Sequence, residues 1–100
     1  MKFEFHPHAL IEYEQAAGYY AGHRAGLERE FINAVEHAID QIVRAPHTWR
    51  KFEDDVRRCL TRVFPYAVLY SIEPDAILII AVMHNRREPG YWRERIGSQT

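Results

Sequence analysis

The side chains best suited to chemistry are concentrated near the end of the sequence, in residues 83–95. These thirteen residues contain one histidine, four arginines, a tyrosine and a tryptophan. The imidazole of His84 is a side chain of the kind that can transfer protons. The guanidinium groups of Arg86 and Arg87 can bind phosphate oxygens through paired donors. The segment therefore predicts proton transfer and phosphate binding at one site. In the alternative interpretation, His84 is a hydrogen-bonded spacer at the end of a strand.

Two aromatic residues, Tyr91 and Trp92, lie in the same segment. Their rings are suited to stacking on a nucleic-acid base. In the alternative interpretation the C-terminal segment folds back, so that both rings cover the core and the arginines face water.

A buried strand is expected to hold this segment in place. Residues 76–83 are all apolar and rich in Ile, Leu and Val, which is typical of a central strand. Earlier in the chain, residues 56–63 have the composition of another strand, and its period of two places Arg58 and Arg62 on one face. These two arginines could act together on an anionic partner, or they could simply form a solvated strand face.

Helical periodicity predicts two helices before these strands. The helices are expected at residues 8–22 and 27–44, because Gly22 and Gly26 bracket a break and Pro46 follows the second helix. Glu12 and Glu14 should point away from the apolar stripe of the first helix. That stripe is expected to consist of Leu10, Tyr13, Ala17 and Tyr20.

The remaining segments complete the predicted fold. A strand is expected around Phe3 and Phe5, a loop at residues 45–55, and three antiparallel strands at residues 56–63, 67–73 and 76–83. The predicted fold class is α+β, with an antiparallel helical hairpin packed on a mostly antiparallel four-stranded sheet and a short C-terminal segment. Residues expected to be buried in its core include Phe31, Ile42, Leu69 and Ile79.

Length and composition limit what the chain can be. One hundred residues with 47% hydrophobic content suit a single domain over residues 1–100. No apolar stretch is long enough to span a membrane and no signal sequence is recognised, so a cytoplasmic location is expected. The single cysteine, Cys59, should be a small buried apolar residue, and the pair His6 and His8 is too little for a metal site. We expect no metal and no cofactor.

Charge is unevenly distributed although the net charge is only −1. Residues 1–43 carry three basic and seven acidic side chains, whereas residues 44–100 carry ten basic and seven acidic ones. The second half therefore suits an anionic partner, but the excess is small for a free-standing nucleic-acid binder.

Several motifs in this order resemble the RelE/ParE superfamily of bacterial toxins from type II toxin–antitoxin pairs. An arginine-rich strand at residues 57–63 is followed by Phe64-Pro65-Tyr66 and by a strand ending in Tyr70. Residues 84–92 then read His-x-x-Arg-x-Pro-x-Tyr-Trp. The resemblance extends over nearly the whole chain and implies the α+β fold predicted above.

The resemblance leaves the activity open between two classes. RelE-like toxins cut messenger RNA on the ribosome, and in such an endoribonuclease His84, Arg87, Tyr91 and Arg62 would be the catalytic residues. ParE-like toxins instead inhibit DNA gyrase by binding, and the residues contacting the target would be Arg58, Arg62, Arg86, Arg87 and Trp92. The enzymes often carry an arginine just after the corner aromatic, where this chain has Ala67. Some also carry a pair of lysines in the preceding loop, whereas Lys51 is followed here by Phe52 and three acidic residues. We therefore favour the ParE-like class. A third alternative is an inactive binding scaffold.

The resemblance also implies partners. A cognate antitoxin should neutralise the toxin by folding on its surface as an amphipathic helix or an added strand. The two proteins could assemble into a higher-order hetero-oligomer. The target would be DNA gyrase or the ribosome with its messenger RNA, and no membrane is involved.

Overall fold

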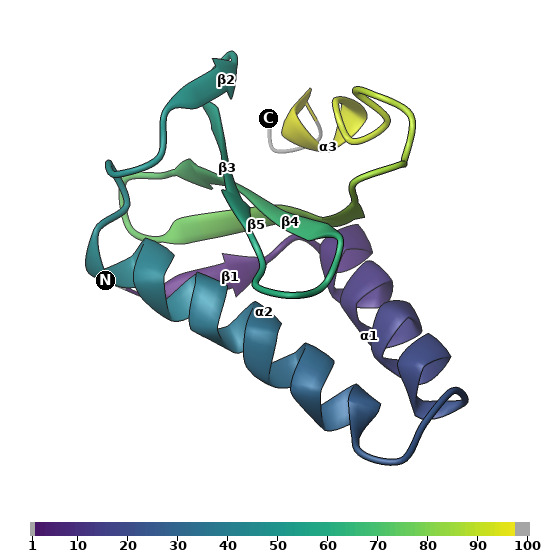
Figure 1. The fold of residues 1–100 in the computed structure, drawn as a ribbon. Coiled ribbons are helices and arrows are strands. Elements are labelled where there is room, and N and C mark those ends of the chain that lie inside the picture. Colours follow the sequence, from purple (N-terminus) through teal and green to yellow (C-terminus); the bar gives the residue numbers. More distant parts are fainter. Residues whose placement is uncertain (1, 98–100) are drawn as a thin grey trace.

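Two helices cover one face of a five-stranded sheet in the computed structural model, which describes residues 2–97 (Figure 1). The C-terminal segment lies over the opposite face. The strand order is β1-β5-β4-β3-β2, with β1 parallel to β5 and every other pair antiparallel. The strands are β1 (Phe3–Phe5), β2 (Lys51–Glu53), β3 (Val56–Leu60), β4 (Tyr66–Ile72) and β5 (Ile77–His84). The predicted α+β class is confirmed.

The helices are α1 (Pro7–Ala21), α2 (Leu27–Arg44) and the short α3 (Glu94–Gly97). Pro7 stands at the start of α1, where its missing N–H costs nothing. The Nδ1 atom of His6 caps the helix by accepting the His8 N–H at 3.1 Å. Gly26 precedes α2 with a φ of 86°, a left-handed conformation that glycine adopts without strain. This turn lets α2 return antiparallel to α1, as predicted.

The buried stripe of α1 differs from the predicted one. Leu10 is 41% exposed, so its predicted place in the core is wrong. Ala17 is buried as predicted, and Ala9 and Ala16, which lay outside the predicted stripe, are buried as well. Small alanine side chains let the helix approach the sheet closely. The helix is therefore rotated about its axis relative to the prediction, and Glu12 points toward the sheet instead of away from it.

The sheet has one more strand than expected. Part of the predicted loop at residues 45–55 forms β2, which pairs with β3. The predicted order of the last three strands is confirmed, but β3 ends at Leu60 instead of residue 63. The early end has a backbone cause, because Val63 adopts a φ of 70° that no strand contains. Arg62 therefore lies in a turn and does not share a strand face with Arg58.

The apolar run in β5 shows no alternation because both faces of the strand are buried, and a β-bulge interrupts its pairing with β4. Leu69 pairs with Ala81 whereas Tyr70 pairs with Ile79, so Ile80 is an extra residue. Side chains on both faces of β4 and β5 are buried. The helix side includes Val68, Tyr70, Ile77, Ile79 and Val82, and the opposite side includes Ala67, Leu69, Ile80, Ala81 and Met83. The second core is closed by Trp92, which is 1% exposed.

The predicted core residues Phe31, Ile42, Leu69 and Ile79 are all fully buried, and Cys59 is buried as expected. Replacing Leu69 or Ile79 with alanine should lower the free energy of unfolding by about 2–5 kcal/mol, because each change leaves a cavity. Leu10→Ala is the matched control, since its side chain is 41% exposed and its change should cost about 1 kcal/mol or less. Urea denaturation measures all three, and equal losses for Leu10→Ala and Leu69→Ala would contradict this core.

Candidate functional site

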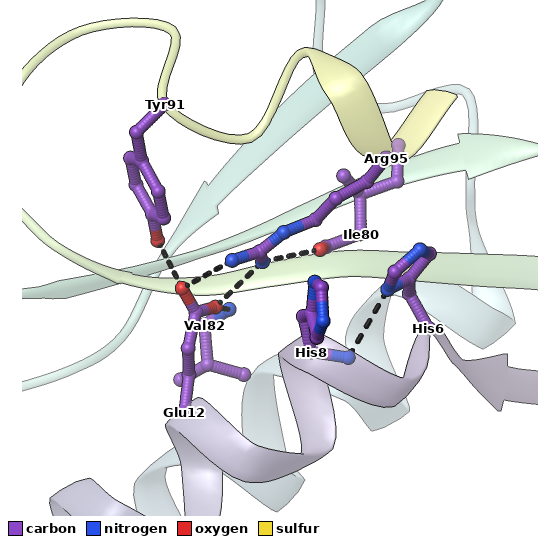
Figure 2. A network of polar contacts seen from close by, with 7 residues as sticks. All are labelled: His6, His8, Glu12, Ile80, Val82, Tyr91 and Arg95. Carbon is purple, nitrogen blue, oxygen red and sulfur yellow. Dashed lines mark hydrogen bonds and ion pairs between the residues drawn. The ribbon is translucent and has the colours of Figure 1, made fainter. Parts of the chain in front are cut away.

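The most extensive polar network in the described part of the chain surrounds the carboxylate of Glu12 on α1 (Figure 2). The Arg95 guanidinium donates to both carboxylate oxygens at 2.9 Å. The Tyr91 hydroxyl donates to Oε2 at 2.6 Å, and the Val82 N–H donates to Oε1 at 3.0 Å. Arg95 also donates to the Ile80 carbonyl at 3.0 Å. One carboxylate thus joins α1, β5 and the C-terminal segment.

The network lies where β5 loses its neighbour. β1 pairs with β5 only as far as Ile79, whose carbonyl accepts the His6 N–H at 2.8 Å. Beyond that point the bulged edge of β5 still carries backbone groups that need partners. Glu12 supplies an acceptor for one of them, at Val82, and Arg95 supplies a donor for another, at Ile80. The side chains therefore continue the hydrogen bonding that a longer β1 would have provided.

The Glu12–Arg95 pair is largely shielded from water, with 14% and 11% of the two side chains exposed. Its two parallel hydrogen bonds give the geometry in which such a pair is strongest. Burial, followed by the hydrogen bond to Glu12, raises the pKa of Tyr91 above its usual range. The phenol therefore stays protonated at neutral pH and remains a donor to the carboxylate.

Three of the residues predicted from the sequence meet beside this network. His84, Arg87 and Tyr91 line one hollow of about 270 Å³, together with Tyr66 and Glu12. The Arg87 guanidinium stacks over the Tyr91 ring, 4.0 Å from its centroid. The His84 ring packs edge-on against Tyr66, and its Nδ1 accepts the Arg86 N–H at 3.0 Å. One imidazole nitrogen is thus already occupied by the backbone.

The other predicted residues lie elsewhere. Arg62 borders a separate hollow with Glu30 and Asn33 of α2. Arg58 is exposed and lies over the Phe52 ring at 5.6 Å. Arg86 is exposed beside His84, next to the hollow that Arg87 lines.

Trp92 has the position foreseen in the alternative interpretation of the sequence. It is buried in the second core, with its ring edge-on to Phe52 at 5.8 Å. In this position its indole covers the core and is not exposed for stacking on a base.

Sequence reasoning missed Glu12 and Arg95. A signal existed for Glu12, since it stands three residues after Ala9 and four before Ala16, in line with a stripe of small residues. No comparable signal existed for Arg95, because its partners become available only through the bulge in β5.

Residues 2–97 contain neither a metal-binding cluster nor a membrane-spanning helix. No three or more His, Cys, Asp or Glu side chains in this range are arranged to hold a metal ion. No helix in the same range combines the length and apolar character needed to cross a membrane.

Comparison with known families agrees with this fold. Residues 3–89 match the sequence profile of the ParE toxins of type II toxin–antitoxin systems (parDE). The chain belongs to the ParE toxin family. No curated protein matches it significantly. A ParE-family toxin has a cognate antitoxin as its partner. In this toxin, the matched range includes Glu12, His84 and Arg87, whereas Tyr91 and Arg95 lie beyond it.

The Glu12–Arg95 pair can be tested by a double-mutant cycle. Arg95→Met should lower the free energy of unfolding by about 3–5 kcal/mol, because it leaves a buried carboxylate without its counter-charge. The double variant Glu12→Leu with Arg95→Met should lose less than the sum of the two single changes, since the uncompensated charge is gone. Arg93→Met is the matched control, because Arg93 pairs with Glu53 in an exposed position and should matter little. Equal losses for Arg93→Met and Arg95→Met, measured in urea, would contradict the assignment.

His6 makes stability depend on pH. Its side chain is buried, and burial together with Arg95 and His8 lowers the pKa of His6 below 6.5, with Glu12 opposing. The unfolded chain therefore takes up this proton at a higher pH than the folded chain does. The contribution of His6 is complete above pH 6.5 and is lost as the pH falls through the folded pKa. His6→Asn keeps a capping oxygen that does not titrate, so between about pH 7 and pH 5 its free energy of unfolding should fall less steeply than that of the wild type. Parallel slopes in urea titrations at several pH values would refute this.

Proposed function

We propose that this toxin inhibits DNA gyrase by binding to it and that it performs no chemistry of its own. The observation that carries the proposal is the carboxylate of Glu12, which lies beside His84, Arg87 and Tyr91 in the hollow where a ribonuclease would have to hold a phosphate. A site that stabilises the growing negative charge of phosphate cleavage needs donors and cations. Glu12 instead accepts the hydrogen bonds of the Tyr91 hydroxyl and the Arg95 guanidinium, so these donors are not available to a phosphate there.

The side chains around the hollow are also committed to one another. The Tyr91 hydroxyl donates to Glu12, and the Arg87 guanidinium packs on the Tyr91 ring. Proton transfer requires a group that can reach the substrate, and phosphate binding requires a guanidinium whose donors point outward. Tyr91 would have to leave Glu12 before its hydroxyl could transfer a proton, whereas Arg87 is exposed and keeps its donors available for a partner. This commitment supports a structural role for Tyr91.

Binding to a folded target needs a different arrangement, which the exposed arginines provide. Arg58, Arg62 and Arg86 are exposed and form no ion pair with any residue between 2 and 97. Unpaired cations of this kind steer a protein toward an acidic partner and fix its orientation there. We assign them, with Arg87, to contacts with gyrase.

The alternative function is ribosome-dependent cleavage of messenger RNA. It is favoured by one observation, namely that His84 and Arg87 line the same hollow as Tyr91. In that function His84 would transfer the proton and Arg87 would stabilise the charge, while Arg62 would act from another hollow. The inactive scaffold is the third alternative. All three share the cognate antitoxin, the hetero-oligomeric complex with it, and action in the cytoplasm, where both targets are found.

Two variants separate these functions. Arg87→Ala should weaken association with purified gyrase, His84→Ala should leave it unchanged, and intoxicated cells should show no new messenger RNA ends. A ribonuclease would instead lose about 10²-fold or more in cleavage rate in each variant, with its fold and ribosome association retained. Gyrase supercoiling assays and mapping of messenger RNA ends make the measurement. Codon-positioned cuts that disappear in Arg87→Ala would overturn the proposal.

Growth provides the control for the third alternative. Expression of the chain alone should arrest bacterial growth, and coexpression of the cognate antitoxin should restore it. Abundant folded toxin in cells that grow normally would indicate the inactive scaffold.

A further inference from the structure

Two backbone groups on the edge of β5 that faces the hollow have no partner among residues 2–97. The Asn85 N–H donates to the Pro65 carbonyl at 2.8 Å, on the side of β4. Hydrogen bonds in an antiparallel pair involve every second residue of a strand, so Met83 also faces β4. Val82 and His84 therefore direct their N–H and C=O groups to the opposite side, where β1 has already ended.

Only two of these four groups are used within the described part of the chain. The Val82 N–H donates to Glu12, and the His84 carbonyl accepts the Arg87 N–H at 2.9 Å. The Val82 carbonyl and the His84 N–H remain, and both residues line the hollow. Val82 is 2% exposed, and a backbone group without a partner is costly away from water. A ligand that supplies one donor and one acceptor at this place therefore binds favourably.

The unused pair has the spacing of one residue in an added strand. The two groups flank Met83, and a residue opposite Met83 in a parallel strand would donate its N–H to Val82 and accept the N–H of His84. β1 bonds in this way to the preceding part of the edge, where the His6 N–H donates to the Ile79 carbonyl at 2.8 Å. The hollow of about 270 Å³ is smaller than a typical small-molecule pocket, so it suits one residue of a peptide.

The walls of the hollow define the side chains that such a peptide should carry. Ala16 and the rings of Tyr19 and Tyr66 give the hollow apolar surfaces. Arg87 lines the same hollow, and its guanidinium is exposed and forms no ion pair within residues 2–97. The matching ligand is thus an extended peptide with an apolar residue beside a carboxylate.

We propose that the cognate antitoxin inserts an extended segment into the hollow, with one apolar residue paired to Met83 and a neighbouring carboxylate on Arg87. A segment that folds on binding arrives with its backbone groups unpaired, whereas a folded target has used its own groups internally. The backbone donor and acceptor in the hollow therefore favour the antitoxin as the occupant. Its carboxylate would cover Arg87 and keep this residue from the target. The inference goes beyond the proposed function, because it holds for any target of the toxin.

Amide hydrogen exchange of the wild-type toxin, followed by NMR, tests the backbone contact directly. In the free toxin the His84 N–H should exchange faster than the Val82 N–H, which is bonded to Glu12. Saturation with purified antitoxin should slow exchange at His84 by about tenfold or more, because this amide gains an acceptor. The Asn85 N–H is the internal control, since its bond to Pro65 is present with and without antitoxin and its exchange reports any general gain in stability.

Gln15→Trp tests the hollow itself, because it enlarges an exposed side chain of the α1 wall so that it fills the space. Its affinity for the antitoxin, measured by titration calorimetry, should fall by about tenfold or more with an unchanged thermal midpoint. Glu14→Trp is the matched control, since it adds the same ring to an exposed position of α1 outside the hollow. Arg87→Ala should also lower the affinity, and the loss should shrink at high salt because an ion pair at the rim is screened.

The contrary outcomes are equally definite. Tight binding of the antitoxin while the His84 amide stays unprotected would overturn the inference, and so would equal affinities of Gln15→Trp and Glu14→Trp. Unchanged affinity of Arg87→Ala would overturn the acidic ligand. Protection of His84 by purified gyrase but not by the antitoxin would assign the hollow to the target instead. If Gln15→Trp lowers the thermal midpoint, the exchange measurement on the wild type decides alone. The antitoxin measurements contain no gyrase, so a failure of the proposed function would leave their result standing.

Discussion

The buried ion pair between Glu12 and Arg95 determines how this small protein closes. The two residues are 83 positions apart in the sequence, yet their bidentate contact supplies partners for the edge of β5 where β1 has ended. Without it, a bulged central strand would present unsatisfied backbone groups next to the core, at a cost of about 1–3 kcal/mol for each group. The same contact positions the C-terminal segment, so that Trp92 covers the second core and Tyr91 is fixed over the hollow.

The Glu12–Arg95 pair accounts for part of the uneven charge distribution. The acidic first half and the basic second half suggest a surface directed at an anionic partner. However, Glu12 belongs to the first half and Arg95 to the second, so part of the asymmetry is used inside the fold to join the two ends of the chain. The positive charge that remains outside is carried by separate arginines, among them Arg58 over Phe52 and Arg62 beside α2. Such a distribution suits contact with a protein surface better than tight binding of a continuous nucleic-acid backbone.

Periodicity was sufficient to predict both helices and the order of the last three strands, because apolar residues at helical or alternating spacing must face a core. The prediction failed where packing, and not the spacing of apolar residues, decided which side chains are buried. Leu10 appeared to belong to the buried stripe, but the neighbouring alanines allow a closer approach to the sheet, and so they are buried instead. The extra residue in β5 could not be foreseen either, since residues 76–83 are apolar on both faces and a bulge leaves no mark in such a run. The site depends on that bulge, which is why Arg95 could not be named from the sequence, whereas Glu12 lies in line with the small residues of α1 and was missed.

The family match ends before the C-terminal residues that contact Glu12. The match ends at residue 89, after β5 and His84. The residues that decide what the hollow can do follow it, because Tyr91 supplies its hydroxyl to Glu12 and Arg95 neutralises the same carboxylate. A chain with the matched range but with a different C-terminal segment would leave Glu12 without its partners and the second core without Trp92. In this toxin the residues that close the sheet form a charge-neutral, hydrogen-bonded cover around Glu12, so this carboxylate is compensated within the fold.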